Sequence, residues 1–195
     1  MIYIIIITIL LFIITYLISE QYENKKWAKE PLKNFPFKWK GKEYWYSRAC
    51  AVSLFVFCKN TENKWCVLAN KRGENTPDFK GFWNCICGYL DFNENSIQAA
   101  QRECKEETNV FIPSQEIEII GVDSEPQSNK QNVTIRHCVI LEDKTTSDFK
   151  LSNKNSEYKE VEDVKWIPLD EIDNYEWAFD HKTLIQIIAE NHNII

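Results

Sequence analysis

The chain has 195 residues, 44% of them apolar and 27% charged, with a net charge of −6 at pH 7. That length suits one domain plus an appendage, and the apolar content allows a core of ordinary size. Eight of the 23 Lys and Arg and four of the 29 Asp and Glu lie in residues 19–48, which leaves 15 basic and 25 acidic residues after them. An acidic body argues against broad nucleic-acid binding.

The first 18 residues contain no charge, no glycine and no proline. As a helix they would reach ~27 Å, close to the thickness of a bilayer core. We predict a single uncleaved transmembrane helix over residues 1–18. A cleaved signal peptide is the alternative, but the segment lacks a basic start and a small-residue cleavage site before Glu20. The positive-inside rule places the rest of the chain in the cytoplasm, because four lysines follow closely: Lys25, Lys26, Lys29 and Lys33.

Residues 19–47 are basic and aromatic, and we interpret them as a linker between the anchor and a domain over 48–195. Two placements stay open for their aromatic residues, the membrane interface or the surface of the domain. These residues are Trp27, Phe35, Phe37 and Trp39.

Seven cysteines are scattered through the chain, mostly inside apolar runs. Their number is odd and no two have CxxC spacing, so neither a complete disulfide framework nor a zinc site is indicated. We expect small buried hydrophobic side chains in a reducing compartment, which agrees with a cytoplasmic domain.

Two β-rich apolar runs open the domain, at Ala49–Phe57 and Trp65–Ala69, and we predict a buried strand for each. The second run ends in Asn70, Lys71, Arg72 and Gly73. A loop punctuated by proline and glycine follows, and residues 82–88 then lead into the most informative part of the chain.

Residues 88–110 join a glycine, a short acidic loop and a helix rich in carboxylates. Glu103, Glu106 and Glu107 stand three and four residues apart, so they share one helix face within an arc of roughly 100°. Like charges that close repel each other, and a multivalent cation is the simplest remedy. Hard oxygen ligands suit Mg²⁺ or Mn²⁺. We predict an N-cap at Asn95 or Ser96, with Gln98 as capping-box partner.

This stretch resembles the Nudix box, G-x(5)-E-x(7)-R-E-U-x-E-E-x-G-U, in which U is a bulky apolar residue. Asn109 stands where the family has glycine, and asparagine tolerates the left-handed conformation of a helix C-cap better than most residues. Just ahead, Ile86 and Cys87 replace the Pro and Gly frequent in the family. The matching positions are Gly88, Glu94, Arg102, Glu103, Cys104, Glu106, Glu107 and Val110.

Three further strands and a final helix are predicted after the box. Glu116–Val122, Asn132–Leu141 and Glu160–Ile167 alternate or run apolar, and Phe179–Asn191 is an amphipathic helix. The polar stretch Glu142–Glu157 is predicted to be a mobile excursion. The resemblance implies an α/β fold, a Nudix-type α/β/α sandwich around a mixed sheet, here preceded by the N-terminal transmembrane helix.

The resemblance also implies hydrolysis of a nucleoside diphosphate linked to another moiety. Metal, Mg²⁺ or Mn²⁺, would be bound by Glu103, Glu106 and Glu107, with the Gly88 carbonyl as a family ligand. It would neutralise the diphosphate and activate water. Arg102 lies four residues before Glu106, so it can orient that carboxylate.

Other residues are candidates for substrate or proton contacts. A strand ending in arginine is also found ahead of the box in the family, so Arg72, together with Arg48, is assigned to substrate phosphates; a surface charge is the alternative for Arg72. Glu94 is assigned either an additional metal bond or the holding of its loop. Because relatives often use a glutamate outside the box, Glu157 and Glu160 are candidates for a base or ligand, against simple exposure.

No Ser–His–Asp set is indicated among the three histidines. His137, inside a predicted strand, is interpreted as a packed core residue. His181 precedes the last helix and is expected to cap it rather than to face a ligand.

Two other functional classes stay open: a nucleotide-binding sensor module without turnover, and an isoprenoid-diphosphate isomerase. The retained carboxylates argue against the first, and no Cys and Glu placement supports the second. The expected partner is a small-molecule nucleotide, with membrane contact through residues 1–18 and a homodimer as a further possibility from the family. Substrate identity lies in loops that the sequence leaves unassigned.

Overall fold

The structure is a computed structural model that describes residues 7–16, 18, 34–126, 132–154 and 159–194. The chain divides into two compact units, Met1–Arg48 and Ala49–Ile195.

The first unit contains a helix over residues 7–16 and an antiparallel hairpin, β1 (Phe35–Trp39) and β2 (Lys42–Tyr46). Lys40 and Gly41 form its two-residue turn with φ of 48° and 76°, the left-handed values such hairpin turns require. Part of the predicted linker therefore has regular structure.

Among the residues that the structure describes, no helix is both long and apolar enough to cross a bilayer. The predicted span of residues 1–18 includes 1–6 and 17, which lie outside the described residues, as does Trp27. The transmembrane helix is therefore not supported by the structure and stays a prediction.

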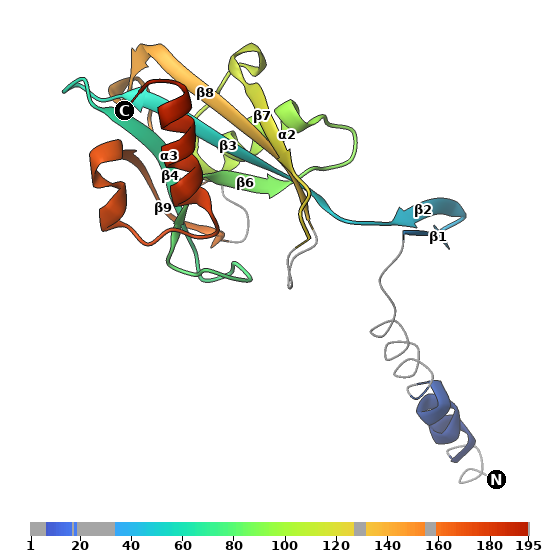
Figure 1. Ribbon diagram of the computed structural model, residues 1–195. Coiled ribbons are helices and arrows are strands. Elements are labelled where there is room, and N and C mark those ends of the chain that lie inside the picture. Colours follow the sequence, from blue (N-terminus) through green and yellow to red (C-terminus); the bar gives the residue numbers. More distant parts are fainter. Residues whose placement is uncertain (1–6, 17, 19–33, 127–131, 155–158, 195) are drawn as a thin grey trace. The chain divides into compact units, whose positions relative to one another are not determined.

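The second unit is built on a seven-stranded mixed sheet (Figure 1). Its order is β5-β4-β3-β8-β7, and β6 pairs with β3 while β9 pairs with β4. The pair β3–β8 is parallel, and the other pairs are antiparallel. The strands are β3 (Cys50–Lys59), β4 (Trp65–Arg72), β5 (Trp83–Asn84), β6 (Ile86–Tyr89), β7 (Glu118–Asp123), β8 (Val133–Thr145) and β9 (Val161–Pro168).

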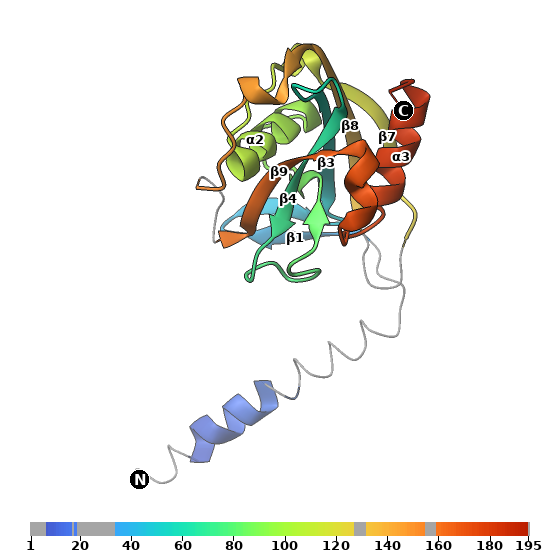
Figure 2. The ribbon, with the colours of Figure 1, turned by 90° about the vertical axis from the view of Figure 1, so that its left-hand side faces the viewer.

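Two helices cover opposite faces of this sheet, α2 (Ser96–Thr108) and α3 (His181–Asn191), as Figure 2 shows. Alternate residues of a strand face opposite sides, so β3 supplies both cores. Leu54 and Val56 pack in the core on the α2 side, and Phe55 and Phe57 in the core on the α3 side. The predicted mixed sheet between helical layers is confirmed.

Short 3-10 helices complete the connections: η1 (Ser114–Glu116), η2 (Thr146–Asp148) and η4 (Leu169–Asn174). All seven cysteines are free thiols, as predicted, and five of them are buried.

The predicted mobile excursion at Glu142–Glu157 is wrong for its described part. Strand β8 continues to Thr145, and Phe149 and Leu151 then pack against the core on the α2 side. The Ser152 backbone N–H also donates to the Thr108 carbonyl at 3.0 Å. Two partly buried apolar side chains thus attach this stretch to the core, while several of its polar residues stay exposed.

Candidate active site

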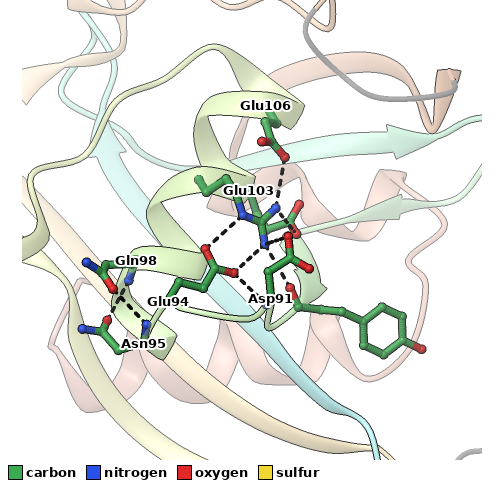
Figure 3. Close-up of polar contacts among 8 residues, drawn as sticks. Asp91, Glu94, Asn95, Gln98, Glu103 and Glu106 are labelled. Carbon is green, nitrogen blue, oxygen red and sulfur yellow. Dashed lines mark hydrogen bonds and ion pairs between the residues drawn. The ribbon is translucent and has the colours of Figure 1, made fainter. Parts of the chain in front are cut away.

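Helix α2 begins and ends as the sequence predicts. The Asn95 side chain accepts from the Gln98 backbone N–H at 3.0 Å, and the Gln98 side chain accepts from the Asn95 N–H at 2.9 Å (Figure 3). At the other end, Asn109 adopts the left-handed conformation with φ of 63°. Asparagine therefore performs the capping role that glycine has in the motif, and the winding of the helix is fixed from both ends.

Gly88 leaves the space that the Glu103 carboxylate occupies. The glycine lies in β6 opposite Val52, and a Cβ built on it would overlap the Glu103 carboxylate. Any other residue would therefore displace that carboxylate from the backbone of β6. Burial raises the pKa of Glu103 to about 7, although the neighbouring Arg102 guanidinium opposes the shift.

Glu107 is held one turn further along α2. It accepts from Asn70 Nδ2 at 2.8 Å and from the Cys87 backbone N–H at 3.3 Å. Burial and then the charge of Glu103 raise the pKa of Glu107 well above its usual range, in spite of the Cys87 hydrogen bond. Two mutually repelling carboxylates thus lie in a poorly solvated place, which is typical of functional sites.

Arg102 joins three acids, Glu94, Glu103 and Glu106, which are labelled in Figure 3. Its guanidinium donates to Glu94 through two nitrogens, at 3.1 and 2.8 Å, and to the Tyr89 carbonyl at 3.0 Å. A third nitrogen donates to Glu103 Oε1 at 2.8 Å and to Glu106 Oε2 at 3.1 Å. Arg102 therefore compensates part of the negative charge, and its own pKa rises further.

Glu94 is engaged in hydrogen bonds that hold its loop. Besides the two bonds from Arg102, it accepts from the Asp91 N–H at 2.8 Å. The hydrogen bond with Arg102 lowers the pKa of Glu94. Of the two roles predicted for this residue, the contacts favour the structural one.

Within the described ranges, no three His, Cys, Asp or Glu side chains are arranged to hold a metal ion. The donors nevertheless fit a divalent cation in chemical terms, because they are carboxylate oxygens, which Mg²⁺ and Mn²⁺ prefer. The pKa values of Glu103 and Glu107 are both raised, that of Glu103 even with Arg102 in contact, so more positive charge would be favourable there.

Arg72, at the end of β4, is not a surface charge. It is 9% exposed and donates to the Asp78 carbonyl at 3.0 Å and to Asp78 Oδ1 at 2.7 Å. The guanidinium carbon lies 5.0 Å from the centre of the Phe179 ring. Its charge opposes the rise in the pKa of Glu107, so the arginine lies within electrostatic reach of the carboxylates.

Glu160, the residue just before β9, lies within electrostatic reach of the same site. The Gly73 N–H donates to the Glu160 carbonyl at 2.7 Å, and a Cβ on Gly73 would overlap the Lys159 carbonyl. The charge of Glu160 contributes to raising the pKa of both Glu103 and Glu107. The other candidate, Glu157, lies outside the described residues, and Arg48 belongs to the N-terminal unit, so both assignments stay predictions.

The two buried histidines, His137 and His181, have structural roles. His137 is fully buried, with its ring nitrogens 3.1 Å from the Ser53 carbonyl and 3.1 Å from Ser96 Oγ, so the core interpretation is confirmed. His181 makes no side-chain cap, and that prediction is wrong. Its Nδ1 instead accepts from the Cys85 N–H at 3.0 Å, and burial lowers its pKa to about 3.

Sequence reasoning missed the partners of the charged groups. Neither Asn70 nor Asp78 belongs to a recognised sequence motif. Asn70 does stand two residues before Arg72, which places both on the same face of β4. That spacing was the available signal for Asn70. Asp78 reaches Arg72 only through the fold of the loop at 73–82.

Residues 48–186 match a family model described as NUDIX domain. A search among curated proteins finds no match.

Solved structures share the fold at low sequence identity. The NUDIX domain of Shewanella oneidensis NrtR complexed with ADP ribose is 23% identical with a TM-score of 0.61, covering 75% of this chain and 90% of that one. A C. elegans Ap4A hydrolase binary complex is 19% identical with a TM-score of 0.54, covering 75% and 99%. A bifunctional NMN adenylyltransferase/ADP ribose pyrophosphatase from Francisella tularensis, complexed with AMP and a Mn ion, is 19% identical with a TM-score of 0.58, covering 91% and 46%.

Proposed function

The chain belongs to the NUDIX domain family, and from that premise we propose that it hydrolyses the diphosphate linkage of a nucleoside diphosphate joined to another moiety. The observation that carries the proposal is the pair Glu103 and Glu107. Both carboxylates have raised pKa values, and Gly88 leaves room for one of them against the backbone. A fold selected for stability alone would have no use for this arrangement.

Mg²⁺ or Mn²⁺ is the proposed cofactor, held by Glu103, Glu106 and Glu107 with the Gly88 carbonyl. When bound, such a cation neutralises phosphate charge and lowers the pKa of a bound water. The Mn ion in the Francisella tularensis structure supports this choice.

The remaining steps are proposed for the side chains of this chain. Asn70 and the Cys87 N–H fix the Glu107 carboxylate, and Arg102 orients Glu106 at 3.1 Å. Positioning of this kind supplies much of the catalysis in phosphoryl transfer. Glu160 is the proposed proton acceptor, because it is exposed and lies within electrostatic reach of both box carboxylates.

A sensor module is the second candidate. It is favoured by one comparison: the fold is shared with the NUDIX domain of NrtR, whose structure was solved in complex with ADP ribose.

A product assay separates the two functions. The purified protein with Mg²⁺ is offered ADP-ribose, Ap4A, nucleotide sugars, dNTPs and capped RNA. Release of a nucleoside monophosphate or phosphate, abolished by EDTA and restored by Mg²⁺ or Mn²⁺, is the expected result. Binding of ADP-ribose without any product from the whole panel would establish the sensor function instead.

We also propose that residues 1–18 anchor the protein in a membrane with the domain on the cytoplasmic side. The support is compositional: the segment has no charge, and lysines follow it. The full chain should pellet with membranes and resist carbonate extraction, and its release into the supernatant would refute the anchor.

A further inference from the structure

Two exposed phenylalanines from distant parts of the chain meet beside Arg72. Phe79 lies in the loop between β4 and β5, and Phe179 lies just before α3. Their ring centres are 4.9 Å apart in an edge-on arrangement. They are 41% and 37% exposed, respectively, although both rings are large and apolar. Exposed aromatic pairs of this kind lose favourable burial unless something covers them.

Both phenylalanines also have an unfavourable backbone conformation. Phe79 has φ of 49° and Phe179 has φ of 59°. Among the described residues with positive φ other than glycine, all the rest are asparagines and lysines. Bulky residues in this region are outliers, and such strain is concentrated at ligand-binding positions. Two strained aromatic residues that touch each other are therefore a combined signal for function.

Arg72 connects this pair with the carboxylates. Its guanidinium lies over the Phe179 ring at 5.0 Å and is bound by Asp78, the neighbour of Phe79 in the loop. Asn70, two residues earlier on the same strand, binds Glu107 at 2.8 Å. Within three residues of β4, Asn70 thus binds the box carboxylate Glu107 and Arg72 contacts the aromatic pair.

We propose that Phe79 and Phe179 form an aromatic platform for the nucleobase of the substrate, which stacks on one ring and packs against the other, while its phosphates lie toward Arg72 and Glu107. The proposal rests on the nucleotide ligand of the function proposed above and assigns two side chains to the base of that ligand. Stacking tolerates any base, since each has a π-face. The platform therefore selects nucleotides over base-free phosphates without selecting one base.

A structural role is the competing explanation, because Phe79 also contacts Phe82 at 5.8 Å and Phe179 contacts His181 at 5.3 Å. The experiment has to keep the apolar bulk and remove only the ring. Phe79→Leu and Phe179→Leu do this, and Phe179→Tyr restores a ring. Phe111→Leu is the matched control, because Phe111 is 60% exposed and follows the box helix.

The measurement is calorimetric binding of AMP, UMP and ribose 5-phosphate to the full chain with Mg²⁺. Wild type should bind AMP and UMP at least about 10-fold more tightly than ribose 5-phosphate. Each leucine variant should remove most of that ratio and leave the ribose 5-phosphate Kd unchanged. Phe179→Tyr and Phe111→Leu should keep the ratio.

Three outcomes would overturn the platform: a wild-type ratio near one, leucine variants that keep the wild-type ratio, or leucine variants that weaken all three ligands equally, together with a lower Tm. Because no turnover is measured, the result is independent of whether the protein hydrolyses anything. A preserved ratio in a protein that fails the product assay would keep the platform and refute only the hydrolase.

Discussion

Two polar side chains, one on each face of the sheet, accept hydrogen bonds from the same short segment of chain and differ in what the loss of solvent does to their pKa values. The Cys87 N–H donates to Glu107 on α2, and the Cys85 N–H donates to Nδ1 of His181 on α3. Burial raises the pKa of Glu107 well above its usual range and lowers that of His181 to about 3. In each case, burial disfavours the charged form.

The difference lies in the neighbours. His181 stays neutral with its acceptor nitrogen satisfied, between the rings of Phe55 and Phe179. Glu107 faces the charges of Glu103 and Glu160, which add to the cost of its ionisation. A satisfied buried dipole serves the scaffold, whereas a cluster of acids whose charge is only partly compensated is poised for a ligand. His181 thus belongs to the scaffold beneath α3, and the acids on the α2 face carry the proposed chemistry.

Replacing the acid on the α2 face should have the largest effect. Glu107→Gln keeps the shape and the contact with Asn70 but removes the carboxylate, so kcat/KM should fall about 1,000-fold. The Tm should stay the same or rise, because a poorly solvated acid has been removed. Steady-state kinetics and thermal unfolding check both parts, and a variant that retains wild-type turnover would contradict the role given to Glu107.

Replacing Glu160 tests whether the acidic cluster on the α2 face includes this residue. Glu160→Gln should lower kcat about 100-fold, the low end for loss of a general base. Glu162→Gln is the control, because Glu162 is two residues away and pairs with Lys71 at the surface. Similar kcat values for the two variants would remove Glu160 from the mechanism.

A substitution at Gly88 tests whether the Glu103 carboxylate on the α2 face needs the space that this glycine leaves. Gly88→Ala places a methyl group where the Glu103 carboxylate lies, so the free energy of unfolding should fall by about 2 kcal/mol and activity with it. Gly121→Ala on β7 is the matched control, because a Cβ there meets no atom within 4 Å. Urea unfolding of the two variants gives the difference, and equal stabilities would show that Glu103 moves aside freely.

The low pKa of His181 should make the free energy of unfolding depend on pH, with no effect on activity. Its folded-state pKa, about 3, is below that of the unfolded chain. Between these values the unfolded state binds the extra proton, so stability falls as pH drops below about 6.5, by about 1 kcal/mol per unit. His181→Gln should show a smaller loss of unfolding free energy from pH 7 to pH 4, and exposed His192→Gln should match wild type. Identical slopes in all three proteins would assign the acid sensitivity elsewhere.

Local features of the fold could be predicted because local residues cause them. The capping box of Asn95 and Gln98, the left-handed Asn109 and the shared arc of the carboxylates all follow from spacing along one helix. The strands followed from apolar runs. The mobility assigned to Glu142–Glu157 was wrong because Phe149 and Leu151 find their core only in three dimensions.

The amino-acid sequence by itself determined the helix, its caps and which acids share its face, since helical winding converts spacing directly into position. Only the tertiary structure decided which partners those acids have: Arg102 linking Glu94 to Glu103 and Glu106, Asn70 binding Glu107, and Glu160 brought near by the backbone of Gly73. The charge balance of the site depends on groups far apart in the chain, and burial, which sets the pKa values, exists only after the sheet has formed.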